Sequence, residues 1–234
     1  MDKAYSLYLQ AQLRAAIAEL GGQLRREPQN SRARTFLFEL LCFAGEFDRA
    51  ETQLDVLAAQ NKASGTGAAF YHDLLVAHRQ REALLEKKSL CRTDQIETHV
   101  MQVNGITYES CVDADARVDG GLETYGAAGY GVTAWEKIQR LEIQKPVRLR
   151  DLLWIPARLL LRETGVAGTE PFPVYLPALA PGTWRHSDDN IRLGKSAVLE
   201  EGPDSQLTAF GAKLLLCDEE TIPLLDVRTL EVEP

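Results

Sequence analysis

The amino-terminal part of the sequence repeats itself at a distance of 34 residues. When residues 9–28 are aligned on residues 43–62, apolar positions coincide. The matched pairs are Leu13 with Phe47, Ala16 with Ala50, and Leu20 with Leu54. A unit of this length buries its apolar face only against a neighbouring unit. We therefore expect residues 3–60 to form stacked antiparallel helices.

Thirty-four residues is the period of the tetratricopeptide repeat, in which each unit is a helix-turn-helix pair. Ala50 takes the small position where two helices cross closely, and Gly45 supplies the turn before the second helix. Pro28 lies where the first unit ends, and proline cannot continue a helix. The inward positions are Leu37, Leu41, Leu54 and Leu57. The alternative is a generic helical hairpin with coincidental spacing.

A further amphipathic helix is predicted over residues 69–88, after a loop at 61–69. His72 and His78 lie six positions apart, and this spacing does not place them on one helical face. We expect two surface or rim residues rather than a pair of metal ligands.

Beyond residue 92 the sequence favours strands joined as hairpins. Asn104-Gly105 stands between two β-favouring runs and predicts a tight hairpin turn. Two more hairpins are expected from 157–164 with 171–178 and from 208–218 with 221–232, and one short helix over 132–141. The predicted fold class is α+β with two domains. We expect residues 1–92 to form a tetratricopeptide-like helical domain and residues 93–234 to form a mostly antiparallel, β-rich α+β domain.

The composition excludes several classes of protein. The formal net charge of −8 argues against binding to nucleic-acid phosphates. No stretch approaches the roughly 18–20 uncharged apolar residues of a membrane span. The start of the chain lacks the apolar region of a signal peptide. We expect a soluble, cytoplasmic protein that contacts neither nucleic acid nor membrane.

The four cysteines are far apart in the sequence: Cys42, Cys91, Cys111 and Cys217. A zinc site or a redox motif needs closer spacing, and disulfides are unusual in a reducing compartment. We expect ordinary buried or half-buried thiols, and neither a metal nor a cofactor.

An acidic run at residues 113–121 is the first candidate for chemistry. Counted from Asp113, it lacks the ligands and the glycine of a calcium-binding loop. We expect a turn in which Asp113 and Asp115 cap backbone amides and pair with Arg117. A metal-dependent enzyme using Asp113, Asp115 and Arg150 is the alternative.

A second polar signature lies within the leucine-rich run 149–161, where Arg150 and Asp151 stand close to Trp154. An arginine held by a carboxylate stacks readily on an indole ring, which can anchor a fold or bind a ligand. No nucleophile and base stand together here, so no catalytic residue is assigned.

Taken in order, these segments resemble the ImpE family, the TagJ- and SciE-like accessory proteins of the bacterial type VI secretion system. The segments that carry the resemblance are 36–54, 113–117, 130–138, 149–157, 176–182 and 224–228. The chain departs from the family in a short central helical region and in Ala180, which stands at an aromatic position.

The resemblance implies a non-enzymatic adaptor. Such proteins bind the amino-terminal helix of the small sheath subunit, TssB, and are linked to sheath recycling by the ATPase ClpV. A chaperone of secreted effectors is a further alternative, and the sequence leaves the oligomeric state open.

A repeat array leaves a groove between its first helices, in which an amphipathic helix can dock. Alignment of 31–64 on the repeat places Arg32, Thr35, Glu39 and Cys42 along the inner face, with Phe36 and Phe43 beside it. Charge would set the register of the partner, and the two aromatic residues would supply apolar area. The rival surface is the region of 113–117 and 149–154 in the second domain.

Overall fold

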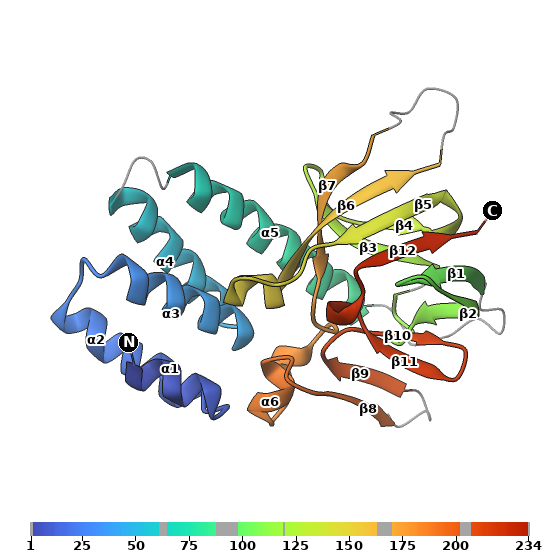
Figure 1. Cartoon of the computed structure of the whole chain (residues 1–234). Coiled ribbons are helices and arrows are strands. Elements are labelled where there is room, and N and C mark those ends of the chain that lie inside the picture. Colours follow the sequence, from blue (N-terminus) through green and yellow to red (C-terminus); the bar gives the residue numbers. More distant parts are fainter. Residues whose placement is uncertain are drawn as a thin grey trace.

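The computed structural model describes residues 2–60, 65–87, 98–118, 120–162, 170–201 and 207–233. Within these ranges, five helices come first and a strand-rich part follows (Figure 1). The helices are α1 (Asp2–Leu9), α2 (Leu13–Arg26), α3 (Ser31–Phe43), α4 (Phe47–Gln60) and α5 (Gly65–Lys87). This order confirms the predicted α+β fold class. No helix of the described residues is long and apolar enough to cross a membrane.

The helical stack forms as the 34-residue offset predicts. The aligned positions Leu13, Ala16, Leu20, Ala50 and Leu54 are all buried in one core. Pro28 lies in the turn between α2 and α3, and the Asn30 side chain begins α3 by accepting a hydrogen bond from the amide of Ala33.

Within the described residues, ten strands form one antiparallel sheet in the order β11-β10-β2-β1-β12-β5-β6-β7-β3-β4. Their bounds are β1 His99–Val103, β2 Ile106–Asp113, β3 Gly121–Gly126, β4 Gly129–Ala134, β5 Ile138–Ile143, β6 Trp154–Leu161, β7 Phe172–Pro177, β10 Leu214–Cys217, β11 Glu220–Pro223 and β12 Thr229–Val232. Strands β8 (Ala197–Glu201) and β9 (Leu207–Gly211) pair separately, and the short helix α6 (Asp189–Arg192) precedes them.

The predicted hairpins are present. Asn104 and Gly105 have φ angles of 52° and 84°, and Val103 stands opposite Ile106 across the turn. Positive φ at both central residues matches the right-handed twist of the flanking strands. Strands β6 and β7 form the second hairpin, and β10 and β11 form the third.

The short helix predicted over 132–141 is wrong. Strand β4 ends at Ala134, a single 3₁₀ turn occupies Trp135–Lys137, and β5 follows. Ile138, Leu141 and Ile143 are buried in the core of the sheet, where β5 pairs with β12 and β6. Pairing and burial on the sheet therefore override the helical spacing of this segment.

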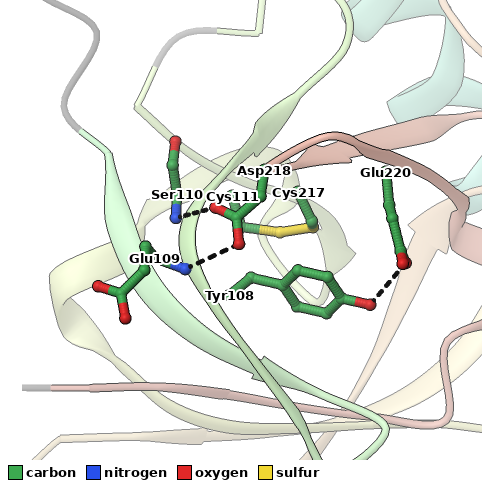
Figure 2. Close-up of a disulfide and its surroundings, with 7 residues drawn as sticks. All are labelled: Tyr108, Glu109, Ser110, Cys111, Cys217, Asp218 and Glu220. Atoms are coloured by element: carbon green, nitrogen blue, oxygen red, sulfur yellow. Dashed lines mark hydrogen bonds between the residues drawn. A yellow bond between two sulfur atoms is a disulfide. The ribbon is translucent and has the colours of Figure 1, made fainter.

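The expectation of free thiols is wrong for two cysteines. Cys111 on β2 and Cys217 on β10 face each other directly and form a disulfide (Figure 2). Strand pairing joins residues 106 positions apart, which sequence spacing does not reveal. Cys42 is a buried free thiol, and Cys91 lies outside the described residues.

Hydrogen bonds reinforce the strands around this disulfide (Figure 2). The Tyr108 hydroxyl donates to Oε2 of Glu220 at 2.8 Å. The Asp218 carboxylate accepts the amides of Ser110 and Glu109 at 2.9 and 3.2 Å. Side chains that follow Cys217 thus hold the part of β2 that leads up to Cys111.

The helices and the sheet share part of one core. Trp154, at the start of β6, stacks on Phe38 of α3 with the ring centroids 6.2 Å apart. Leu153 and Tyr125 join the same helical core, and α5 packs against β3 and β4 (Figure 1). The domain boundary predicted near residue 92 lies outside the described residues and stays a prediction.

Candidate functional site

A groove of about 570 Å³ lies between the first helices and the segment that precedes β6. Helix α1 contributes Tyr5 and Tyr8, and the lining from α3 is Arg32, Thr35, Phe36 and Glu39. The opposite side is formed by Pro146, Val147, Arg148, Leu149 and Leu152. The helical repeat and the leucine-rich signature thus meet at a single surface.

One side of the groove is an aromatic wall, formed by Tyr5, Tyr8 and Phe36. Their ring centroids lie between 5.9 and 6.2 Å apart. Tyr5 is 51% exposed, whereas Phe36 is buried. The wall therefore presents apolar area to solvent on a rigid base, as docking surfaces for helices do.

The other side is held by a 3₁₀ turn, η3 (Leu149–Leu152). Oδ2 of Asp151 accepts the amides of Val147 and Arg148, both at 2.9 Å. This cap fixes the preceding loop and leaves Val147 88% exposed at the groove. Leu153 and Trp154, which follow η3 in the sequence, are buried in the core. Their burial fixes the position of this side of the groove.

Glu39 is the acidic residue of the groove lining, and it is buried. Burial raises its pKa to about 7, although the charge of Arg150 opposes the shift. Nη1 of Arg150 lies 3.6 Å from Oε1 of Glu39, and the guanidinium lies 4.9 Å from the Tyr71 ring centroid. The pair links α3 to η3 beneath the groove.

Residues near α6 fix the end of α1 and the start of α2. Nζ of Lys195 donates to the carbonyls of Tyr8 and Leu9 at 2.9 and 2.8 Å. Oδ2 of Asp189 accepts the amide of Leu13 at 2.8 Å. These three hydrogen bonds, the end clamp, give polar partners to the ends of both helices, with charges of the favourable sign.

The predicted partner-binding residues are placed as follows. Arg32, Thr35, Phe36 and Glu39 line the groove. Phe43 does not, because α3 is buried all round from Phe36 onward and its last turn lies inside the stack. Cys42 is enclosed in the same way.

The signature residues Arg150, Asp151 and Trp154 all make contacts within the chain. Asp151 caps the loop, Arg150 pairs with Glu39, and Trp154 is buried between the helices and the sheet. The groove lining also contains Tyr5, Tyr8, Val147 and Arg148, which the sequence motifs do not predict. The spacing of Tyr5 and Tyr8 on one helical face was the available signal for the first two.

The acidic turn is capped as expected, with one difference in pairing. Asp115 accepts from Nη2 of Arg117 at 2.6 Å, and Asp113 accepts the amide of Asp115 at 2.9 Å. The ion-pair partner of Asp113 is Lys213, at 2.5 Å, rather than Arg117. Arg150 pairs with Glu39 instead, so the structure does not unite the three residues of the enzyme alternative.

Asp113 belongs to a buried network with Arg81, Glu123 and Lys213. Glu123 accepts from Nε and Nη2 of Arg81 at 2.6 and 2.9 Å and from Nζ of Lys213 at 2.5 Å. Burial alone would raise the pKa of Glu123, but both cations outweigh it and hold the pKa well below its ordinary range. The network joins α5 to the sheet and is closed to solvent.

The two histidines of α5 differ from each other. His78 is buried, contrary to expectation, and its Nδ1 lies 3.0 Å from the Tyr125 hydroxyl. Burial lowers its pKa to about 4, so the ring is neutral at pH 7. His72 is partly exposed beside Glu51. In the part of the chain that the structure describes, no three acidic, histidine or cysteine side chains form a metal site.

Comparison with known proteins agrees with both halves of this architecture. A tetratricopeptide repeat model matches residues 7–69, and the model of the ImpE protein family matches residues 105–231. The crystal structure of protein VPA1032 from Vibrio parahaemolyticus shows the same fold, with a TM-score of 0.85. The two chains are 19% identical, and the match covers 99% of this chain and 98% of that one.

A relative of named function is the type VI secretion system accessory component TagJ of Pseudomonas aeruginosa. It is 26% identical over 256 residues, which cover 94% of this chain and 87% of TagJ. The match to the ImpE model spans more than half of the 234 residues, in agreement with the motifs. The chain belongs to the ImpE family.

Proposed function

We propose that this protein is an accessory component of a type VI secretion system that binds the amino-terminal helix of the small sheath subunit, a TssB-like protein. The likeness to TagJ supports the accessory role. The observation that carries the binding mode is the groove, in which exposed Tyr5 faces a segment with exposed Val147.

The groove has the properties that an amphipathic helix requires. Such a helix presents apolar side chains at spacings of three and four and buries them between two apolar walls. The aromatic wall is one of these surfaces, and Val147, Leu149 and Leu152 form the other. Its volume is about 570 Å³, which is within the range of known ligand pockets.

In this proposal the protein works through contacts and not through catalysis. It holds the sheath subunit during assembly, or delivers it to recycling by a ClpV-like ATPase. Both parts of the chain contribute to the site. Helices α1 and α3 form one wall, and η3, from the strand-rich part, forms the other.

The test is a calorimetric titration of the full-length chain with a synthetic amino-terminal helix of the small sheath subunit. Val147→Asp should weaken binding about tenfold or more, because it places a charge in an apolar contact. Ile106→Asp is the matched control, since Ile106 is 58% exposed and is not part of the groove lining. It should bind like the parent.

Two outcomes contradict the proposal: absence of binding to the parent, or equal affinity of the parent and the Val147 variant. Reversal of Glu39 to lysine is a poorer probe. It would place a buried lysine beside the half-buried Arg150 and would lower stability as well as binding.

A further inference from the structure

Two arginines that line the groove have no acidic partner within the described residues. Arg32 lies in the first turn of α3, and Arg148 directly precedes η3. Both are exposed, and neither guanidinium forms an ion pair with a described carboxylate. Of the other surface arginines, Arg49, Arg79 and Arg185 each pair with a carboxylate. Arg25 and Arg26 on α2 form no ion pair with a described carboxylate either, and they lie outside the groove lining.

The acidic residue of the lining does not compensate these two charges. Glu39 is buried and faces Arg150, which lies 3.6 Å away. The exposed charged side chains of the lining are therefore both cationic, Arg32 and Arg148, in a chain whose formal net charge is −8. A local charge opposite to that of the whole molecule selects and orients an approaching partner.

We infer that the occupant of the groove is an amphipathic helix whose apolar stripe is bordered on both sides by acidic side chains. One border meets Arg32 on the α3 side, and the other meets Arg148 on the η3 side. The apolar stripe lies between them, against the aromatic wall and Val147. This inference rests on the proposed function and specifies the chemistry of the partner.

The geometry of the two arginines explains why acidic residues fit best. A guanidinium offers a planar fork of donors that matches a carboxylate, and its position on each rim leaves the apolar centre free. Exposed pairs of this kind each change affinity by about twofold to fivefold. Their larger effect is to fix the register of the helix and to disfavour partners with basic borders.

The experiment uses designed peptides of about 18 residues, or about five helical turns. All carry the same apolar stripe, and the bordering positions are glutamate in one peptide and lysine in the other. The full-length parent should bind the glutamate peptide about tenfold more tightly than the lysine peptide. In about 0.5 M salt this preference should shrink, because exposed pairs are screened.

Charge reversal tests the assignment to these two residues. In the double variant Arg32→Glu with Arg148→Glu, the preference should reverse. The matched control is Arg25→Glu with Arg26→Glu, which changes the net charge equally on α2, outside the groove lining. It should keep the parent's preference.

Failure of this inference differs from failure of the proposed function. Three results overturn the inference of acidic borders, even where the sheath helix binds. They are equal binding of both peptides by the parent, a preference of the parent for the lysine peptide, and a reversed preference in the control variant. Absence of sheath-helix binding, with a preference for the glutamate peptide, overturns the sheath partner alone. Absence of binding by every peptide overturns both.

Discussion

The buried network and the groove both lie where the helices meet the sheet. They differ in whether their charged side chains have partners of opposite charge within the chain. In the network, Glu123 receives Arg81 and Lys213, and Asp113 shares Lys213. In the groove, Arg32 and Arg148 have no described carboxylate partner, and the contact of Glu39 with Arg150 is a longer 3.6 Å.

The difference follows from access to water. A charge removed from solvent must be paired and hydrogen-bonded, or the fold loses several kcal/mol. A charge on an open rim is solvated at little cost and stays available to a partner. The junction therefore has one closed charged region that holds the halves together and one open region suited to recognition.

The largest effect on stability is expected from a substitution in the buried charge network. Glu123→Gln removes one partner of two buried cations and should lower the free energy of unfolding by about 3–5 kcal/mol. Equilibrium denaturation in urea, followed by circular dichroism, measures the change.

Glu142→Gln is the control for this substitution. Glu142 pairs with Arg140 at 3.1 Å, but its side chain is 43% exposed. This variant should lose no more than about 1 kcal/mol. Similar losses for both variants would remove the distinction between closed and open charges.

A slightly smaller effect is expected from the disulfide, which stabilises the sheet far from the groove. The bond closes a loop with a sequence separation of 106 residues and so restricts the unfolded chain. Its loss in the double variant Cys111→Ala with Cys217→Ala should cost about 2–4 kcal/mol. Denaturation under oxidising conditions compares the variant with the parent.

The peptide affinity of the same cysteine variant tests whether the disulfide and the groove are independent. Its affinity for a groove peptide should equal that of the parent, since neither cysteine contributes to the groove lining. A loss of affinity without a loss of stability would show that the sheet controls the groove at a distance.

The smallest effect is expected at Glu39, and it depends on pH. Its pKa is raised from 4.5 to about 7 in the folded chain, so the folded state binds more protons than the unfolded state between these values. Stability from this group is present at low pH and is lost as the pH rises through about 7. Glu39→Gln should therefore stabilise the chain at pH 8, by about 1–3 kcal/mol.

Thermal melts of parent and Glu39→Gln between pH 5 and pH 8 measure this effect. The advantage of the variant should shrink toward pH 5, where the parent carboxyl is also neutral in the folded chain. A variant less stable than the parent at pH 8 would mean that the pair with Arg150 is a net stabilising contact, as in the closed region.

Local patterns predicted much of this molecule. The 34-residue offset identified the helical stack, since Ala16 and Ala50 occupy equivalent close crossings. Asn104 and Gly105 identified a hairpin because a two-residue turn demands positive φ. Four of the five residues predicted for partner binding line the groove because they share one face of α3.

What the sequence did not reveal depends on contacts between distant segments. Cys111 meets Cys217 through the pairing of β2 with β10. His78 is buried because the sheet supplies Tyr125 opposite it. The groove itself needs η3 from the second half of the chain, and no periodicity places that turn beside α1.

The end clamp has a consequence for the order in which the site is completed during synthesis. Leu13 and Asp189 are 176 residues apart, and Tyr8 and Lys195 are 187 apart. At about 5–20 residues per second, a ribosome needs roughly 10–35 s to add the intervening chain. The turn between α1 and α2 gains its partners only then. A nascent or truncated chain therefore lacks these contacts at the end of α1, and under the proposed function the site is complete only in a nearly full-length protein.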